Sequence, residues 1–330
     1  MRPLASVRPR ELDEAVRLLE QARRGGRRAV LAGGGSDLLG MVKERLVEPD
    51  LIVSLRGVRG LDQVASGAEG TRIGGLVTLD AVSEHPAVRA GYAALAEAAQ
   101  SVGTPQIRNV ATLAGNVCQR PWCWYYRAGF PCFKNGGGTC FAATGENQLH
   151  AIFGGGPSYI VHPSDTAPAL VALGALFRLV GPEGERVVPA GEFFTLPGKD
   201  PARENVLKAD EVLAEILLPP PAPATRSTYY KVLDREAWTH AVVSAAVAVD
   251  LEGGVCRRAR IVLGGVAPAP WPLPRVERML EGQRLTADLV AQAATAAVRG
   301  AVPLTKNGYK VPLAKAVVRR ALLAVAGPAR

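Results

Sequence analysis

Four of the five cysteines in this chain of 330 residues lie close together in the sequence. They are Cys118, Cys123, Cys132 and Cys140, spaced C-x4-C-x8-C-x7-C. Thiolates bind soft metals and iron–sulfur clusters, and four of them in one stretch can enclose such a centre. Arginine, lysine, tryptophan and tyrosine residues lie between them, and positive charge lowers thiol pKa values and offsets the charge of a cluster. An iron–sulfur cluster is therefore the favoured prediction.

The alternatives are a zinc site, free thiols, or two disulfides in a loop. The spacing contains neither the C-x2-C pairs of many zinc sites nor the compact ferredoxin run. The chain has only four histidines, which leaves few candidates for a mixed zinc site. The first residues, MRPLASVRPRELDEAV, contain no apolar signal-peptide core. A cytoplasmic location is therefore expected, and cytoplasmic cysteines usually stay reduced.

A glycine-rich segment, LAGGGSDL at residues 31–38, follows a short apolar run and precedes a helical pattern. Consecutive glycines let backbone N–H groups converge on phosphate oxygens. The segment is not G-x-G-x-x-G, because Leu38 stands where the third glycine is needed, and no P-loop lysine follows. On its own it predicts either a pyrophosphate loop or a plain tight turn.

Two further segments are rich in hydrogen-bonding groups. Residues 106–116 offer Thr112, Gly115 and Asn116, and residues 162–165 read His-Pro-Ser-Asp. The first can equally be a strand followed by a capped turn, and Asp165 can be the N-cap of the next helix. A carboxylate at that position can also anchor the hydroxyls of a ribose or ribityl chain.

These segments need a framework of helices and strands to position them. Apolar periodicity predicts helices over residues 12–24, 37–42, 79–85, 92–99, 165–173, 287–299 and 313–323. It predicts strands over 28–32, 50–55, 71–78, 212–218, 229–232, 242–250 and 259–263, with a hairpin over 175–189. Residues 104–163 are expected to be irregular and functional. The proline-rich residues 219–225 are the expected domain boundary.

The net charge of +9 is spread along the chain, with no long basic tail, and aromatic residues make up only 5%. Nucleic acid is therefore not expected as a partner, and an acidic protein or a cofactor phosphate explains the charge more simply. No apolar run reaches the roughly 18 residues that a membrane helix needs.

Taken together, the motifs resemble the FAD-binding subunit of the xanthine dehydrogenase and molybdenum hydroxylase family. The resemblance covers nearly the whole chain, and the motifs occur in the order AGGGSDLL (32–39), IRNVATLAGN (107–116), HPSDTAPALVALGA (162–175), EVLAEILLP (211–219), YYKVLDREA (229–237), GGVAPAP (264–270) and YKVPLAKAVVRRAL (309–322). The cysteine-rich residues 117–161 resemble an insertion in one branch, which includes the flavin subunits of 4-hydroxybenzoyl-CoA reductase and of certain bacterial aldehyde dehydrogenases. That branch carries an extra 4Fe-4S cluster.

The resemblance implies an α+β fold. Residues 1–222 would form a two-part FAD-binding domain of the PCMH, or vanillyl-alcohol-oxidase-like, type, with subdomains of about 1–55 and 56–222. Residues 223–330 would form a smaller α+β domain of the CO dehydrogenase flavoprotein type. FAD would be held by Ala32, Gly33, Gly34, Gly35, Ser36, Asp37, Leu38, Thr112, Gly115, Asn116, Ser164, Asp165, Leu213 and Lys231. A lysine beside the flavin stabilises its anionic reduced form.

The cysteine pattern departs from that branch in one place. Cys123, Cys132 and Cys140 match the first three cluster cysteines, but the fourth is absent, and Tyr159 stands near its expected position. Cys118 is predicted to supply the fourth thiolate, with His150 and His162 as the next candidates.

The implied function is electron transfer within a heterotrimer. The substrate would react at molybdopterin on a large subunit, and electrons would pass through 2Fe-2S clusters on a small subunit to FAD, and then to an external acceptor or donor. No catalytic residues for the substrate are expected in this chain. The alternatives are a self-sufficient FAD-dependent oxidase or reductase, and a non-catalytic iron–sulfur or zinc scaffold without FAD.

Overall fold

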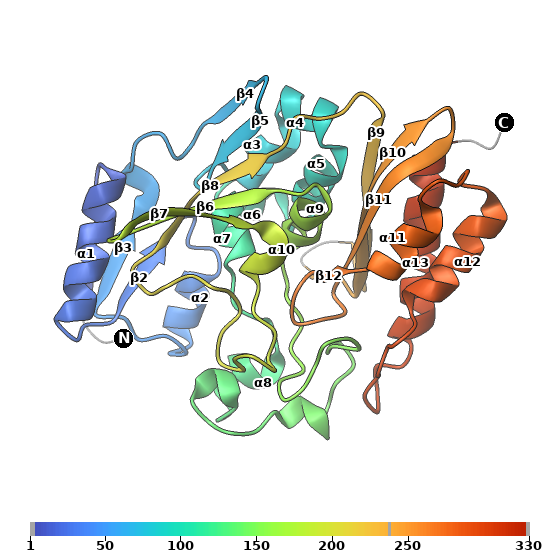
Figure 1. Ribbon diagram of the computed structural model, residues 1–330. Helices are drawn as coiled ribbons and strands as arrows, with labels where there is room; N and C mark the ends of the chain where they lie inside the picture. Colours follow the sequence, from blue (N-terminus) through green and yellow to red (C-terminus); the bar gives the residue numbers. More distant parts are fainter. Residues whose placement is uncertain (1–3, 237–238, 328–330) are drawn as a thin grey trace.

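The computed structural model describes residues 4–236 and 239–327, and it contains three β-sheets in chain order (Figure 1). Ala237, the last residue of the motif that begins at Tyr229, lies outside the described residues. The α+β fold class predicted from the sequence is confirmed. No helix within the described ranges is long and apolar enough to cross a membrane.

The first sheet is parallel, with strand order β1-β3-β2. Its elements are β1 (Ala5–Val7), α1 (Leu12–Arg24), β2 (Ala29–Ala32), α2 (Leu38–Lys43) and β3 (Leu51–Ser54). Helix α1 carries buried Ala15, Val16, Leu19 and Ala22 on one face, as its periodicity predicts, and packs on β2 and β3. The glycine-rich segment therefore leaves the carboxyl end of β2 and enters α2.

The second sheet lies at the centre of the molecule, with strand order β4-β5-β8-β6-β7 (Figure 1). Its strands are β4 (Val64–Gly67), β5 (Gly70–Gly74), β6 (Leu176–Gly181), β7 (Gly184–Pro189) and β8 (Val212–Leu218). The helices of this part are α3 (Leu79–Glu84), α4 (Pro86–Gly91), α5 (Ala93–Gln100), α6 (Pro105–Arg108), α7 (Leu113–Val117), α9 (Thr166–Ala172) and α10 (Ala190–Phe193). The hairpin β6–β7 and strand β8 lie where the sequence predicts them.

The third sheet is antiparallel, with order β12-β11-β10-β9. Its elements are β9 (Thr225–Val232), β10 (Val243–Glu252), β11 (Val255–Gly264), β12 (Trp271–Pro272), α11 (Pro274–Leu280), α12 (Ala287–Ala297) and α13 (Lys310–Ala326). Alternate residues of β10 pack on these helices, while Ala246 on its other face packs against α5 and α9. Alanines on α5 and α9 allow this close approach, so the C-terminal sheet is anchored to the N-terminal part of the chain.

The cysteine-rich residues form an irregular segment below the central and C-terminal sheets, near the label α8 (Figure 1). The segment contains only α8 (Trp124–Arg127) and two single 3-10 turns, Phe133–Asn135 and Phe141–Ala143. The expectation of an irregular stretch over 104–163 is wrong at its start, because α6 and α7 are short helices with Thr104 and Thr112 as N-caps. Short capped helices carry little periodicity, so pattern alone misses them.

Candidate functional site

A cavity of about 370 Å³ lies where the glycine-rich segment, the cysteine-rich segment and the C-terminal domain meet. Its wall includes residues of the glycine-rich segment, the two polar motifs, the cysteine-rich segment and the C-terminal domain: Ser36, Asp37, Gly115, Asn116, Cys123, His150, Asp165 and His240. The volume falls within the range of small-molecule sites. The folding of the chain thus brings segments more than 200 residues apart to one cavity.

The glycine-rich segment meets the second motif by direct contact of the two backbones. A Cβ added to Gly34 would lie 1.9 Å from the carbonyl oxygen of Val110, and one added to Gly33 would lie 2.7 Å from Thr112 Oγ1. Gly35 has a φ of +78°, which favours glycine. Glycine is therefore required here by the neighbouring loop, before any ligand is considered.

The backbone N–H groups of residues 33–37 donate no hydrogen bond to any other part of the chain that the structure describes. A row of free N–H groups beside a cavity suits anionic oxygens, as in a pyrophosphate. This is the observation that fits the loop to the phosphates of FAD.

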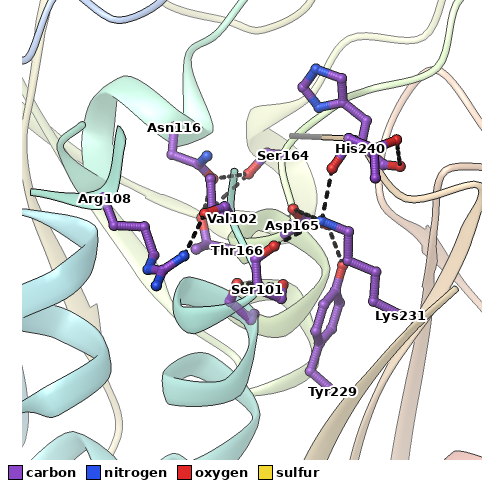
Figure 2. A network of polar contacts seen from close by, with 12 residues as sticks. Ser101, Val102, Arg108, Asn116, Ser164, Asp165, Thr166, Tyr229, Lys231 and His240 are labelled. Atoms are coloured by element: carbon purple, nitrogen blue, oxygen red, sulfur yellow. Dashed lines mark hydrogen bonds and ion pairs between the residues drawn. The ribbon is translucent and has the colours of Figure 1, made fainter. Parts of the chain in front are cut away.

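The second and third motifs are joined by Asn116 (Figure 2). Asn116 Oδ1 accepts hydrogen bonds from Ser164 Oγ at 2.6 Å and from Thr166 Oγ1 at 2.7 Å, all within the protein interior. Thr112 caps α7 by accepting from the N–H of Gly115 at 3.2 Å. These bonds fix the cavity wall, and the hydroxyl proton of Ser164 is already donated to Asn116.

Asp165 lies at the centre of a buried polar network (Figure 2). Its Oδ2 pairs with Lys231 Nζ at 2.7 Å, and its Oδ1 accepts from the hydroxyl of Tyr229 at 2.6 Å. The side chains of Asp165 and Lys231 are each 4% exposed. Lys231 also donates to the carbonyl oxygens of Ser101 and Thr239. Burial, and then the negative charge of Asp165, raise the pKa of Tyr229 well above its usual value.

This network joins α9, in the part of the chain that contains the central sheet, to β9 of the C-terminal sheet. Asp165 stands at the N-cap of α9 without a side-chain capping bond, and Ser164 Oγ instead accepts from the N–H of Ala167. Asp165 therefore occupies the expected N-cap position, but its carboxylate does not cap the helix. Direct contact of Asp165 or Lys231 with a cofactor stays a prediction, because both side chains already bind each other.

Leu213 lies on β8, is 4% exposed, and packs in the central core. It is not among the residues of the cavity wall. Its backbone carbonyl approaches Gly75, where an added Cβ would lie 2.6 Å away. Its predicted place near the adenine or flavin also stays a prediction.

Asp37 connects the glycine-rich segment to the cysteine-rich segment. Its Oδ1 pairs with Arg127 Nη2 at 2.7 Å, and its Oδ2 accepts from the backbone N–H of Arg120 at 2.9 Å. The guanidinium of Arg127 also lies 4.3 Å from the ring centre of Trp122, at the rim of the cavity. Asp37 stands at the N-cap position of α2 and its carboxylate holds the cysteine-rich segment, while its contact with a cofactor stays a prediction.

Cys123 lies close enough to Cys132 and Cys140 for their charges to affect its pKa, and we call these three residues the cysteine triad. The pKa of the Cys123 thiol is raised to about 11, mainly by burial and to a smaller extent by the charges of Cys140 and Cys132. A backbone bridge between Cys132 and Thr139 closes a loop that has Cys132 at one end and Cys140 directly after the other. The N–H of Tyr159 donates to Cys140 Sγ at 3.4 Å, so the chain at the position of the absent cysteine passes beside the triad.

Cys118 is placed differently from the triad. It ends α7 and packs against the central core, whereas Cys123 and Cys132 pack with Met41 and Tyr126 in a separate cluster. Burial alone raises the pKa of Cys118 to about 12, with no contribution from another cysteine. The structure therefore does not bring Cys118 to the triad, and its role as a cluster ligand stays a prediction without structural support.

Within the described ranges, no three Cys, His, Asp or Glu side chains are grouped to hold a single metal ion. Donors that share one ion lie within about 4 Å of one another, because each is roughly 2.0–2.3 Å from the metal. A four-iron cluster distributes its ligands over several irons and holds them farther apart.

His150 is the functional candidate that the cysteine pattern alone does not select. Its Nε2 lies 3.3 Å from Cys123 Sγ, and the residue is 3% exposed. Burial lowers the pKa of His150 to about 4, so the imidazole is neutral near pH 7. The other buried candidate, His162, stacks edge-on against Phe194 and accepts from the N–H of Ser164.

The fold and the cavity together define a flavoprotein of the molybdenum hydroxylase type. Residues 2–221 match the family model of the FAD binding domain in molybdopterin dehydrogenase, and residues 228–325 match the CO dehydrogenase flavoprotein C-terminal domain.

Among curated proteins, the aldehyde oxidoreductase FAD-binding subunit PaoB of Escherichia coli K12 is 34% identical over 308 residues, which cover 92% of each chain. The carbon monoxide dehydrogenase medium chain of Hydrogenophaga pseudoflava is 29% identical and covers 95% of this chain and 94% of its own. A solved structure of carbon monoxide dehydrogenase from the same organism superposes with a TM-score of 0.78 and 27% identity, over 98% of both chains. The chain belongs to the FAD-binding medium subunits of the xanthine dehydrogenase and CO dehydrogenase family of molybdenum hydroxylases.

Proposed function

We propose that this chain holds FAD in the cavity described above and transfers electrons within a molybdenum hydroxylase complex. The observation that carries the proposal is the row of free N–H groups at residues 33–37, locked against residues 110–112 at the cavity edge. Bound FAD supplies a centre that exchanges electrons both singly and in pairs.

The residues of this chain bind and orient the cofactor. The glycine-rich segment offers N–H donors to the pyrophosphate, and Gly115 and Asn116 form the adjoining wall. Buried Asp165 and Lys231 hold the C-terminal domain against that wall. Trp122 and His240, with ring centres 5.3 Å apart, form another part of the wall.

The partners follow from the relatives, whose names describe FAD-binding subunits and medium chains of larger enzymes. A large subunit carries the molybdopterin and the substrate, and a small subunit carries the 2Fe-2S clusters. This chain then connects the small subunit to an external acceptor or donor, in a heterotrimer in the cytoplasm. We further propose that the cysteine-rich segment holds a 4Fe-4S cluster, with the cysteine triad as three of its ligands.

The donor chemistry fits such a cluster. The triad offers three soft sulfur donors, and Arg120, Arg127 and Lys134 lie in the same segment. The side chains of Lys134 and Glu204 are paired at 2.8 Å and are 2% and 6% exposed, so the segment has a fixed polar support of its own.

The test is to purify the isolated chain and to compare flavin content with turnover. About one FAD per chain, with no oxidation of aldehydes or purines until the partner chains are added, is the expected result. Turnover of substrate by the isolated flavoprotein would favour a self-sufficient oxidase instead. A protein that binds no flavin, with or without iron, would favour a scaffold.

A further inference from the structure

Part of the cavity wall is aromatic, and most of this part belongs to the cysteine-rich segment rather than to the motifs predicted to hold FAD. The rings in the wall are those of Trp122, Trp124, His150 and His240. Aromatic side chains beside a cavity are suited to stack on a flat ring of a ligand. The question is which of these rings is free to do so.

Of these four residues, Trp122 is the exposed one. It is 47% exposed, whereas His150 is 3% exposed and Trp124 and His240 are partly buried. Trp124 and His150 also pack edge-on against each other, with ring centres 5.0 Å apart. An indole exposed beside a cavity gains free energy when a ligand covers its apolar surface.

Trp122 is exposed but held in place by Arg127. The guanidinium of Arg127 lies 4.3 Å from the ring centre of Trp122, and the side chain of Arg127 is 9% exposed. Its Nε donates to the carbonyl oxygen of Pro121 at 2.9 Å, directly before the tryptophan, and its Nη2 pairs with Asp37 at 2.7 Å. The orientation of the indole is therefore set before a ligand binds, which reduces the entropy lost on binding.

Two contacts place Trp122 between the polar parts of the cavity wall. Arg127 joins it to the glycine-rich segment, as described above. Its ring centre also lies 5.3 Å from that of His240, and the carbonyl oxygen of the preceding Thr239 accepts from Lys231 Nζ at 3.2 Å. A cofactor whose pyrophosphate binds the glycine-rich segment can therefore place one of its rings at the tryptophan.

FAD has two ring systems, adenine and isoalloxazine. The isoalloxazine is the larger, with three fused rings and an apolar dimethylbenzene edge, so it gains more from an apolar wall. Leu149, Val161 and Val242 contribute apolar surface to the same wall. We propose, resting on the flavin cavity of the proposed function, that Trp122 stacks on the isoalloxazine of bound FAD, with Arg127 as the residue that positions its indole.

The experiment uses the full chain freed of flavin and titrated separately with FAD and with ADP, which has the adenine and the pyrophosphate but no isoalloxazine. Trp122→Ala should lower the affinity for FAD about tenfold, as expected for the loss of one stacked aromatic ring, and leave the affinity for ADP unchanged. Trp122→Phe should recover part of the loss, because its ring can still stack. Bound FAD should be more fluorescent in Trp122→Ala, because a stacked indole quenches the excited flavin.

Phe130 offers a matched control in the same segment. It is 40% exposed and packs on Tyr125 and Phe141, with ring centres 5.2 and 5.0 Å apart, but it is not part of the cavity wall. Phe130→Ala should leave both affinities and the flavin fluorescence unchanged. Circular dichroism checks that each variant folds.

Three results would overturn the inference. Unchanged affinity and fluorescence of FAD in Trp122→Ala would show that the indole does not touch the cofactor. Equal losses for FAD and ADP would assign Trp122 to the adenine or the pyrophosphate, and an equal loss in Phe130→Ala would mean that Trp122 only supports the segment. All three leave the flavin function standing, whereas wild-type protein that binds no FAD would overturn the proposed function as well.

Discussion

The buried pair of Asp165 and Lys231 leads to a prediction that separates structural support from cofactor binding. Removing one partner leaves the other charge buried and unpaired, which typically costs about 3–5 kcal/mol. Both side chains are 4% exposed, so little of this cost is relieved by solvent. Asp165→Asn should therefore destabilise the flavin-free protein by about 3 kcal/mol, even though the amide has nearly the same shape.

The assay is urea unfolding of the flavin-free protein, with the affinity for FAD measured in parallel. The double variant Asp165→Asn/Lys231→Met removes both charges and should recover at least half of the lost free energy of unfolding. In Asp165→Asn, the loss of binding free energy for FAD should not exceed the loss of the free energy of unfolding. If stability changes by less than about 1 kcal/mol while FAD retention is abolished, the carboxylate binds the cofactor directly and this reasoning is wrong.

Three other perturbations test separate parts of the structure. Gly34→Ala should lower both stability and flavin content, because its Cβ would lie 1.9 Å from a carbonyl oxygen. Gly40→Ala, whose Cβ meets nothing within 4 Å and which lies inside α2, should lower neither and should raise stability slightly. Flavin absorbance and thermal unfolding measure both variants. Arg127→Leu should lower FAD affinity at least tenfold by freeing Asp37 and the cysteine-rich segment, while Arg257→Leu, at a surface ion pair, should have no effect in the same titration. Burial lowers the pKa of Lys310 from 10.5 to about 7. Between these two pH values the unfolded chain binds more protons than the folded chain does. The free energy of unfolding should therefore rise with pH across that range. Lys310→Met should remove this rise in urea unfolding of the metal-free protein, and an unchanged pH profile would contradict the lowered pKa.

Periodic elements were predictable from the sequence because their burial repeats with the helix or strand period. Helix α1 and strand β8 have the bounds that their patterns predict, and α12 begins at the predicted residue. Short elements such as α7 depend on one capping threonine and on packing from distant segments, which no local pattern reveals. The matched families confirm the type of fold and of protein that the motifs together predicted.

The candidate site was predictable as a set of segments but not as a set of contacts. Asp37, Asp165 and Lys231 belong to the right motifs, yet their side chains pair with Arg127 and with each other. Such pairings join residues 66 or 90 positions apart, so they depend on the tertiary fold. The cysteine spacing likewise favoured Cys118 by proximity in sequence, whereas the fold places His150 beside Cys123.

The most direct test of the central claim is to purify this chain with an affinity tag from its native host and to measure its cofactors and partners together. The account predicts a complex with one large and one small partner chain, containing FAD and molybdenum in about equal amounts. Isolation as a single flavoprotein that oxidises substrate without molybdenum would contradict it.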